Sequence, residues 1–136
     1  MKKMFYIVLA LILLCIIIGV YKQNKDKQAG DTKMTYEQIT QEEAKRLMAN
    51  EKGYIILDAR TVGEYATGHI PGAICIPNET IGTTEPAELT DKNQLILVYC
   101  RSGNRSKQAA KKLAALGYTN IKEFGGIMEW TGDIEQ

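Results

Sequence analysis

A cysteine just after an apolar run is the residue in this chain best suited to chemistry. Cys100 follows the apolar run 95–98, and residues 101–106 after it are all polar or glycine and include two arginines. Apolar residues then recur at helical spacing over 109–116, and Gly117 is suited to the end of a helix. The pattern predicts a buried strand, a tight loop and a helix, with the cysteine at the start of the loop.

A loop that leads into a helix N-terminus directs unpaired backbone N–H groups at any group that lies within the loop. The positive end of the helix dipole points at the same group. A free thiol with a pKa of about 8.5 is about 3 % thiolate at pH 7, and a pKa lowered by about two units makes it roughly three quarters thiolate. One helix terminus supplies only part of that stabilisation, so we expect Arg101, Arg105 and further amides to supply the rest. Gly103 and Asn104 are best suited to the positive φ angles of such a cradle. Cys100 is therefore predicted to be a nucleophile in an anion-binding loop and not a small core residue.

Four sequence blocks, taken in order, resemble a single rhodanese domain. They are Leu-Asp-Ala-Arg at 57–60, Tyr-Ala-Thr-Gly-His-Ile-Pro-Gly-Ala at 65–73, Tyr-Cys-Arg-Ser-Gly-Asn-Arg-Ser at 99–106 and Phe-Gly-Gly-Ile-Met-Glu-Trp at 124–130. The resemblance covers roughly residues 33–136. It implies an α/β three-layer fold with a central, mostly parallel five-stranded sheet flanked by helices.

The resemblance also implies a reaction, in which Cys100 accepts a sulfane sulfur as a persulfide and passes it on. The expected donor is a small anion such as thiosulfate or a persulfide, the acceptor is a thiol or cyanide, and no cofactor is needed. The residues expected to bind the donor are Arg101, Ser102, Gly103, Asn104, Arg105 and Ser106.

Two other functions remain open. A phosphatase or arsenate reductase of the same fold resembles Cys-x5-Arg, but only four residues separate Cys100 from Arg105, so the loop is one residue too short. The third hypothesis is a non-catalytic interaction module on a membrane tether.

Three more polar residues are candidates near the site. Asp58 follows the predicted strand 54–57, and Arg60 lies two residues further on; we favour a pair that anchors neighbouring loops through charged hydrogen bonds over a catalytic pair. His69, the only histidine, is either a general base for Cys100 or a hydrogen-bonded structural group in a tight turn, and we favour the latter. A single histidine and the lack of Cys-x-x-Cys argue against a metal site.

The remaining patterns place the other elements. Thr40 and Glu43 form a capping box that opens a helix to about Asn50. Strands are expected at 73–76, where Cys75 serves packing, and at 120–124. We expect a turn at 125–126 and a short helix ending near Trp130, which packs on the core. The pattern leaves the conformation of 78–92 open.

The N-terminus carries a separate signal. Lys2 and Lys3 precede seventeen uncharged residues, 4–20, a length that favours a single-pass anchor over a cleaved secretory signal. Residues 1–21 are therefore assigned to an anchor or signal segment, with 4–21 in the membrane, and 22–32 to a flexible polar linker. The two lysines favour an extracytoplasmic domain on a bacterial-type cell membrane, or a secreted one if the segment is cleaved.

Composition limits the rest of the chain. Without Lys2 and Lys3, fifteen of the 17 basic residues remain, against 16 acidic residues, so the rest of the chain is nearly neutral. It therefore lacks the basic surface of a nucleic-acid-binding protein. Three cysteines, one of them Cys15 in the apolar segment, do not make a disulfide framework. We expect one domain at 33–136. It should be monomeric, because it has no further long apolar run that a partner chain would have to bury.

Overall fold

The computed structural model describes the backbone of residues 1–29 and 35–136, and side chains over 1–21 and 35–136. The chain divides into two compact units between Lys33 and Met34.

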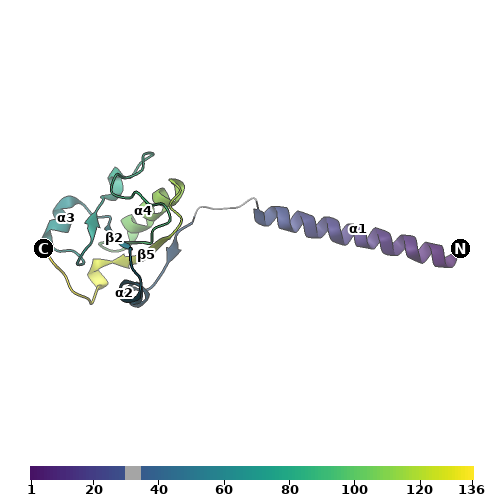
Figure 1. The fold of residues 1–136 in the computed structure, drawn as a ribbon, viewed down its shortest axis with the longest axis horizontal. Helices are drawn as coiled ribbons and strands as arrows, with labels where there is room; N and C mark the ends of the chain where they lie inside the picture. Colours follow the sequence, from purple (N-terminus) through teal and green to yellow (C-terminus); the bar gives the residue numbers. More distant parts are fainter. Residues whose placement is uncertain (30–34) are drawn as a thin grey trace. The chain divides into compact units, whose positions relative to one another are not determined.

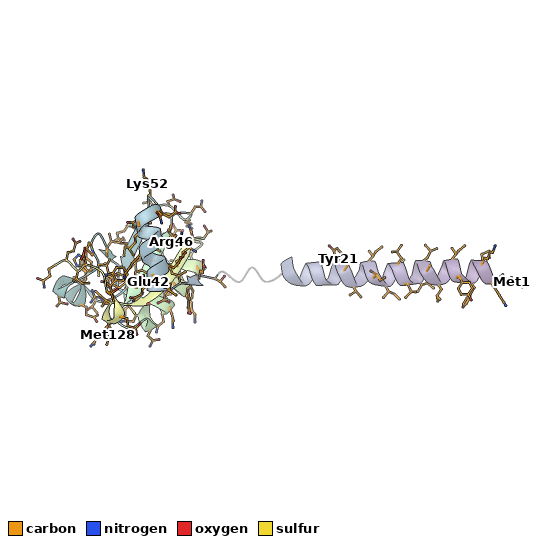
Figure 2. All side chains as sticks on the ribbon, turned by 90° about the horizontal axis from the view of Figure 1, so that it is seen from below. Met1, Tyr21, Glu42, Arg46, Lys52 and Met128 are labelled. Carbon is orange, nitrogen blue, oxygen red and sulfur yellow. The ribbon has the colours of Figure 1, made fainter. Side chains whose placement is uncertain are left out.

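The first unit is the helix α1 (Lys2–Ala29). Its part Lys2–Tyr21 has a mean hydropathy of 2.9 and is long and apolar enough to cross a membrane, a criterion that an N-terminal signal sequence also meets. Side chains project from all sides of the helix between Met1 and Tyr21 (Figure 2), and all of them are exposed. The polar segment 22–32, predicted to be a flexible linker, is helical as far as Ala29, because a helix already formed extends readily through Lys, Gln and Ala. Residues 30–32 of that segment lie outside the described residues.

The second unit is built on a five-stranded sheet in the order β1-β5-β4-β2-β3. The strands are β1 (Glu37–Gln38), β2 (Ile55–Asp58), β3 (Ile74–Cys75), β4 (Ile96–Cys100) and β5 (Ile121–Gly126). All four neighbouring pairs are parallel, which confirms the α/β fold with a central five-stranded sheet. All five residues of β4 are buried, as expected of a central strand covered on both faces.

Helices cover both faces of this sheet, with α2 (Gln41–Asn50) on one side and α4 (Asn104–Ala115) on the other (Figure 1). Alternate residues of β4 enter the two hydrophobic clusters, as the two-residue period of a strand requires. Val98 and Cys100 belong to the cluster that contains α4, whereas Leu97 and Tyr99 belong to the cluster that contains α2. The side chains of Tyr99 and Cys100 therefore lie on opposite faces of one strand.

The helix starts follow local capping rules. Thr40 accepts a hydrogen bond from the backbone N–H of Glu43 at 3.1 Å and begins α2 at the expected residue. The carboxylate of Glu43 binds Arg46 on the same helix. A capping box with both of its hydrogen bonds is found instead at α3 (Val62–Thr67), between Thr61 and Glu64.

Some expected boundaries are wrong in detail. β5 continues through both glycines to Gly126, so the pair 125–126 belongs to the strand and not to a turn before η2 (Ile127–Glu129). The segment 78–92, whose conformation the sequence left open, contains only the three-residue 3-10 helix η1 (Asn78–Thr80), turns and bends. Trp130 packs as expected, with its ring 5.8 Å from that of Phe124.

Candidate active site

Cys100 lies at the carboxyl end of the central strand β4, where open parallel sheets place their functional groups. Three residues then connect the strand to α4. Gly103, with φ of 103°, is the turning point of this loop, because an L side chain rarely adopts that backbone conformation. The expectation that Asn104 also has a positive φ is wrong, since Asn104 already begins α4.

The sulfur of Cys100 is held by hydrogen-bond donors of the loop. It accepts the backbone N–H of Gly103 at 3.0 Å, and only 1 % of the residue is exposed. Burial raises the pKa of the thiol, but hydrogen bonds from the Ser106 hydroxyl and from the N–H groups of Ser106, Gly103 and Ser102 outweigh it. The pKa of Cys100 therefore lies below its ordinary value, the condition for a nucleophilic thiolate.

A buried polar pair forms the floor of the loop. Ser106 is fully buried, and its hydroxyl lies 3.0 Å from the carbonyl oxygen of Gly103 and 2.6 Å from Oε1 of Glu123 on β5. The same Glu123 oxygen accepts the N–H of Gly125 at 2.9 Å. Glu123 is 2 % exposed, so these hydrogen bonds replace the water that its carboxylate loses on burial.

The two arginines of the loop take different positions. Arg105 forms two hydrogen bonds with Glu64 of α3, at 2.7 Å and 2.8 Å, while Arg101 is exposed. The negative charge of Cys100 still raises the pKa of Arg105, after the larger effect of the Glu64 hydrogen bonds. The hydroxyl and amide donors of the loop are thus the main groups that stabilise the thiolate. The sequence interpretation had assigned more of this stabilisation to the two arginines.

The loop lies tightly against the last strand. A Cβ added to Gly126 would meet the carbonyl oxygen of Arg101 at 2.1 Å, closer than any side-chain carbon is found. That oxygen also accepts the N–H of Met128 at 3.2 Å. Glycine at 126 is therefore what allows the backbone of the loop to approach β5.

Asp58 and Arg60 form a buried network with Tyr99. The Arg60 side chain donates to Asp58 at 2.7–3.1 Å and to the carbonyl of Gly68 at 2.7 Å. The Tyr99 hydroxyl donates to Asp58 at 2.7 Å and accepts the N–H of Ile70 at 3.1 Å. Burial raises the pKa of Tyr99, so the phenol remains a donor to the carboxylate. These contacts connect the end of β2 with the turn 68–71, and they are those of a structural anchor.

His69 makes its contacts away from the loop. Its ring stacks on Tyr65 with centroids 3.7 Å apart, and Nδ1 lies 2.9 Å from the carbonyl oxygen of Tyr65. Nε2 lies 3.4 Å from Glu135, whose backbone pairs with that of His69. With both ring nitrogens engaged in this way, the histidine holds the C-terminal segment against the turn that follows α3.

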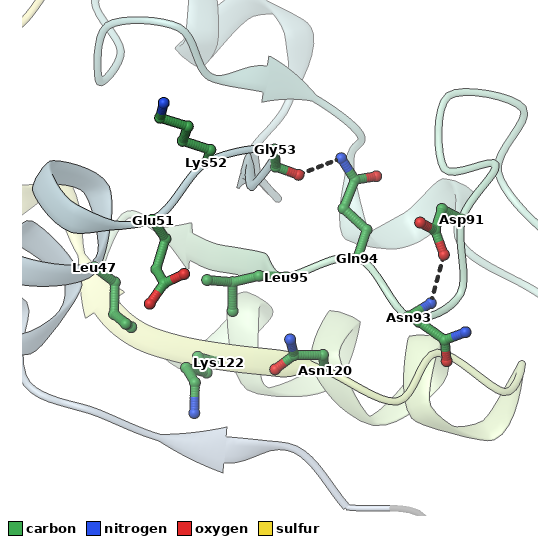
Figure 3. Close-up of a pocket in the computed structure, with 10 residues that line it drawn as sticks. All are labelled: Leu47, Glu51, Lys52, Gly53, Asp91, Asn93, Gln94, Leu95, Asn120 and Lys122. Atoms are coloured by element: carbon green, nitrogen blue, oxygen red, sulfur yellow. Dashed lines mark hydrogen bonds between the residues drawn. The ribbon is translucent and has the colours of Figure 1, made fainter.

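Two hollows lie at opposite ends of the sheet. One, of about 460 Å³, borders Ser102, Gly103 and Glu123 and extends to the start of α2. The other, of about 640 Å³, lies beside Leu95 and Asn120 at the amino ends of β4 and β5 (Figure 3). Because reactive groups collect at the carboxyl ends of parallel strands, the hollow beside the loop is the one relevant to Cys100.

Sequence reasoning missed three residues that support the site. Glu123 appeared only within the predicted strand 120–124, Tyr99 only as the first residue of the block 99–106, and Glu64 was given no role. The Thr-x-x-Glu pattern at 61–64 was a signal for the cap of α3, but no pattern connects Glu64 with Arg105, 41 residues away. Within residues 1–21 and 35–136, no group of three or more His, Cys, Asp or Glu side chains is placed to hold a metal ion.

Comparisons with known proteins agree with this geometry. Thiosulfate sulfurtransferase PspE of Escherichia coli (strain K12) is 34% identical over 73 residues, which cover 54% of this chain and 70% of PspE. Adenylyltransferase and sulfurtransferase UBA4 of Candida albicans is 34% identical over 96 residues, 65% of this chain. That match covers 22% of UBA4, so the chain spans about a fifth of the length of this relative.

Solved structures and a family model give the same relationship. A rhodanese-like domain protein from Staphylococcus aureus superposes with a TM-score of 0.60 at 35% identity, covering 71% of this chain and 92% of that one. The family model of the rhodanese-like domain matches residues 40–133, which include Cys100, its loop and strands β2 to β5. This chain therefore belongs to the rhodanese-like domain family.

Proposed function

We propose that the domain is a sulfurtransferase in which Cys100 carries the transferred sulfur as a persulfide. The observation that carries this proposal is the hydrogen bond from the Gly103 N–H to the Cys100 sulfur at 3.0 Å, made at the N-terminus of α4. Donors aimed at the sulfur stabilise a thiolate before the reaction and a terminal persulfide sulfur after it. Sulfurtransferases among the relatives of the chain support the same reaction class.

The reaction has two balanced steps. The Cys100 thiolate attacks the outer sulfur of thiosulfate; a new S–S bond forms, the old S–S bond breaks, and its electron pair leaves with sulfite. A thiolate or cyanide then attacks the terminal sulfur of the Cys100 persulfide and returns the Cys100 thiolate. A persulfide donor follows the first step in the same way, with a thiolate as the leaving group.

Two features favour this reaction over phosphoryl transfer. A phosphatase loop needs donors around three equatorial oxygens, including an arginine that faces the phosphate. In this domain Arg105 comes one residue too early and binds Glu64 with both terminal nitrogens. The enclosed Cys100, 1 % exposed, fits a single terminal sulfur better than a tetrahedral phosphoryl group.

Mass spectrometry of the full chain in detergent, after incubation with thiosulfate, tests the proposal. We expect a mass gain of one sulfur atom, located on Cys100 and removed by cyanide. Cys75→Ser should keep the added sulfur, because Cys75 lies on the edge strand β3 with a pKa that burial raises. Cys100→Ser should lose it. Hydrolysis of an aryl phosphate that depends on Cys100, without any added sulfur, contradicts the assignment.

We also propose that α1 anchors the domain to a cell membrane, with the domain on the extracytoplasmic face. Support comes from the 20-residue apolar stretch Lys2–Tyr21 and from the two lysines that begin it. A sulfurtransferase in that position would act on donors and acceptors outside the cytoplasm.

A further inference from the structure

Arg105, one of the two arginines of the loop, is already bound to a carboxylate. Nη1 of Arg105 lies 2.7 Å from Oε2 of Glu64, and Nη2 lies 2.8 Å from Oε1. The two side chains are 26% and 31% exposed, so the pair lies at the surface beside the loop. Such a two-pronged contact fixes both the direction and the charge of the guanidinium.

Glu64 is held from its other side as well. Its Oε2 accepts the backbone N–H and the hydroxyl of Thr61, each at 3.0 Å, as part of the capping box of α3. Hydrogen bonds from Arg105 lower the pKa of Glu64, and those from Thr61 add to the effect. The carboxylate is therefore ionised at neutral pH and fixed in place, and it does not turn away when an anion arrives.

Negative charges outnumber positive ones around the loop before a donor binds. The Cys100 thiolate, Glu64 and the buried carboxylate of Glu123 are negative, while Arg101 and Arg105 are positive. Glu79 of η1 also acts on Arg105 and raises its pKa further, after the larger effect of Glu64. Thiosulfate brings two more negative charges to this site, whereas the anion of a simple organic persulfide, R–S–S⁻, brings one.

We propose that Glu64 is a specificity-determining residue that neutralises Arg105 and so selects singly charged persulfide donors over the small dianion thiosulfate. The proposal rests on the sulfur-transfer function proposed above and names its substrate class. In the favoured step the Cys100 thiolate attacks the terminal sulfur of R–S–S⁻, a new S–S bond forms, and the electron pair of the broken S–S bond leaves with R–S⁻.

Glu64→Gln in the full chain in detergent tests the proposal. Glutamine serves in a capping box as glutamate does, so the substitution removes the charge and keeps the cap of α3. We expect kcat/KM for thiosulfate to rise about tenfold, and kcat/KM for 2-hydroxyethyl persulfide, whose anion carries a single charge, to change less than about threefold, because the freed positive charge acts twice on a dianion. The gain should shrink at high salt, which screens charges near the surface.

Two further variants make the result specific. Glu88→Gln removes an exposed carboxylate that forms no ion pair within residues 35–136. This control should leave kcat/KM unchanged for both donors. Adding Arg105→Gln to Glu64→Gln should cancel the gain for thiosulfate, because the charge that was freed belongs to Arg105.

The outcomes separate the two proposals. A Glu64→Gln chain that loses activity equally with both donors would mean that Glu64 only holds Arg105 in position, and this overturns the inference. Equal gains with both donors overturn it as well. If the wild-type chain gains sulfur on Cys100 from neither donor, the sulfur-transfer function itself fails, and the selection by Glu64 fails with it.

Discussion

The hydroxyl oxygen of Ser106 lies 2.6 Å from Oε1 of Glu123, and both residues are almost completely buried. A hydroxyl has one proton to donate, so Ser106 directs it to Glu123, to the carbonyl oxygen of Gly103 or to the sulfur of Cys100. The stabilisation of the thiolate by Ser106 therefore competes with a hydrogen bond to a buried carboxylate.

Ser106→Ala should make Cys100 less reactive. Hydrogen bonds to charged groups contribute about 1.5–3 kcal/mol, and loss of this donor should lower the alkylation rate at pH 7 by about tenfold or more. Rates of alkylation measured against pH check this, and the inflection for Ser106→Ala should move to higher pH. Ser102→Ala is the matched control, because the Ser102 side chain is exposed and only its main-chain N–H acts on the sulfur. An unchanged dependence of the alkylation rate on pH in Ser106→Ala would show that the Ser106 hydroxyl does not stabilise the thiolate.

Stability should depend on pH through Cys100. The pKa of this thiol is lowered in the folded chain below its ordinary value, so the unfolded chain binds more protons between the two pKa values. In that window the free energy of unfolding should rise with pH, at up to about 1.4 kcal/mol per pH unit. Urea unfolding of wild type and Cys100→Ser, compared at each pH, isolates this contribution. The extra free energy of unfolding of wild type over Cys100→Ser should be lost as the pH falls through the folded pKa of Cys100. A trend of opposite sign would show that the loop does not stabilise the thiolate.

Tyr99→Phe should weaken the fold and leave the chemistry intact. The substitution removes a donor to Asp58 and leaves the N–H of Ile70 without its acceptor, at a cost of about 1–3 kcal/mol. The urea midpoint should fall, while the alkylation rate of Cys100 stays that of wild type because Tyr99 lies on the opposite face of β4. Tyr36→Phe provides a control, since its hydroxyl accepts only from the exposed Gln38 and should cost less than about 0.5 kcal/mol. A large loss of reactivity in Tyr99→Phe would show that the network also supports the loop.

Gly126→Ala should displace the loop from β5. The new methyl group overlaps the Arg101 carbonyl, and relief of such crowding typically costs about 1–3 kcal/mol. Both the urea midpoint and the alkylation rate of Cys100 should fall. Gly82→Ala introduces the same group into open space and should leave both unchanged. Equal behaviour of the two variants would contradict the close approach at Gly126.

Protease added to intact cells should remove the domain if α1 is an anchor with the orientation proposed. The physical basis is the pair Lys2 and Lys3, which precede the apolar stretch and favour a cytoplasmic N-terminus. Immunoblotting of the membrane fraction measures the loss of the full-length chain, with a cytoplasmic protein as the control for cell integrity. Full protection of the domain would reverse the orientation, and recovery of a shortened domain in the medium would indicate a cleaved signal.

Local patterns predicted the elements well. The apolar run before Cys100, the cap at Thr40 and the Gly-His-Ile-Pro turn each involve neighbours in sequence, and the strands and helices they imply are present. Gly103 was predicted for its positive φ for the same reason, since only the local backbone decides it. Asn104 was wrongly paired with it because a single left-handed residue is enough to start α4.

The partners of the polar residues were harder to predict. Ser106 meets Glu123, and Arg105 meets Glu64, only because β5 and α3 pack on either side of the loop. A sequence records that charges are present, but the order of strands in the sheet decides which of them become neighbours. The sequence interpretation therefore assigned both arginines to stabilising the thiolate, although Arg105 hydrogen-bonds the carboxylate of Glu64.

The floor beneath Cys100 comes from β5, near the end of the chain, and this has a consequence for synthesis. Cys100 leaves the ribosome before Glu123, Gly125 and Gly126, so a nascent or truncated chain carries it in an unfinished loop. Such a thiol has the pKa of a free cysteine, about 8.5, and is mostly protonated at neutral pH. We therefore expect Cys100 to reach full reactivity only when β5 has packed against the loop, and to oxidise slowly before that because the protonated thiol is a poor nucleophile.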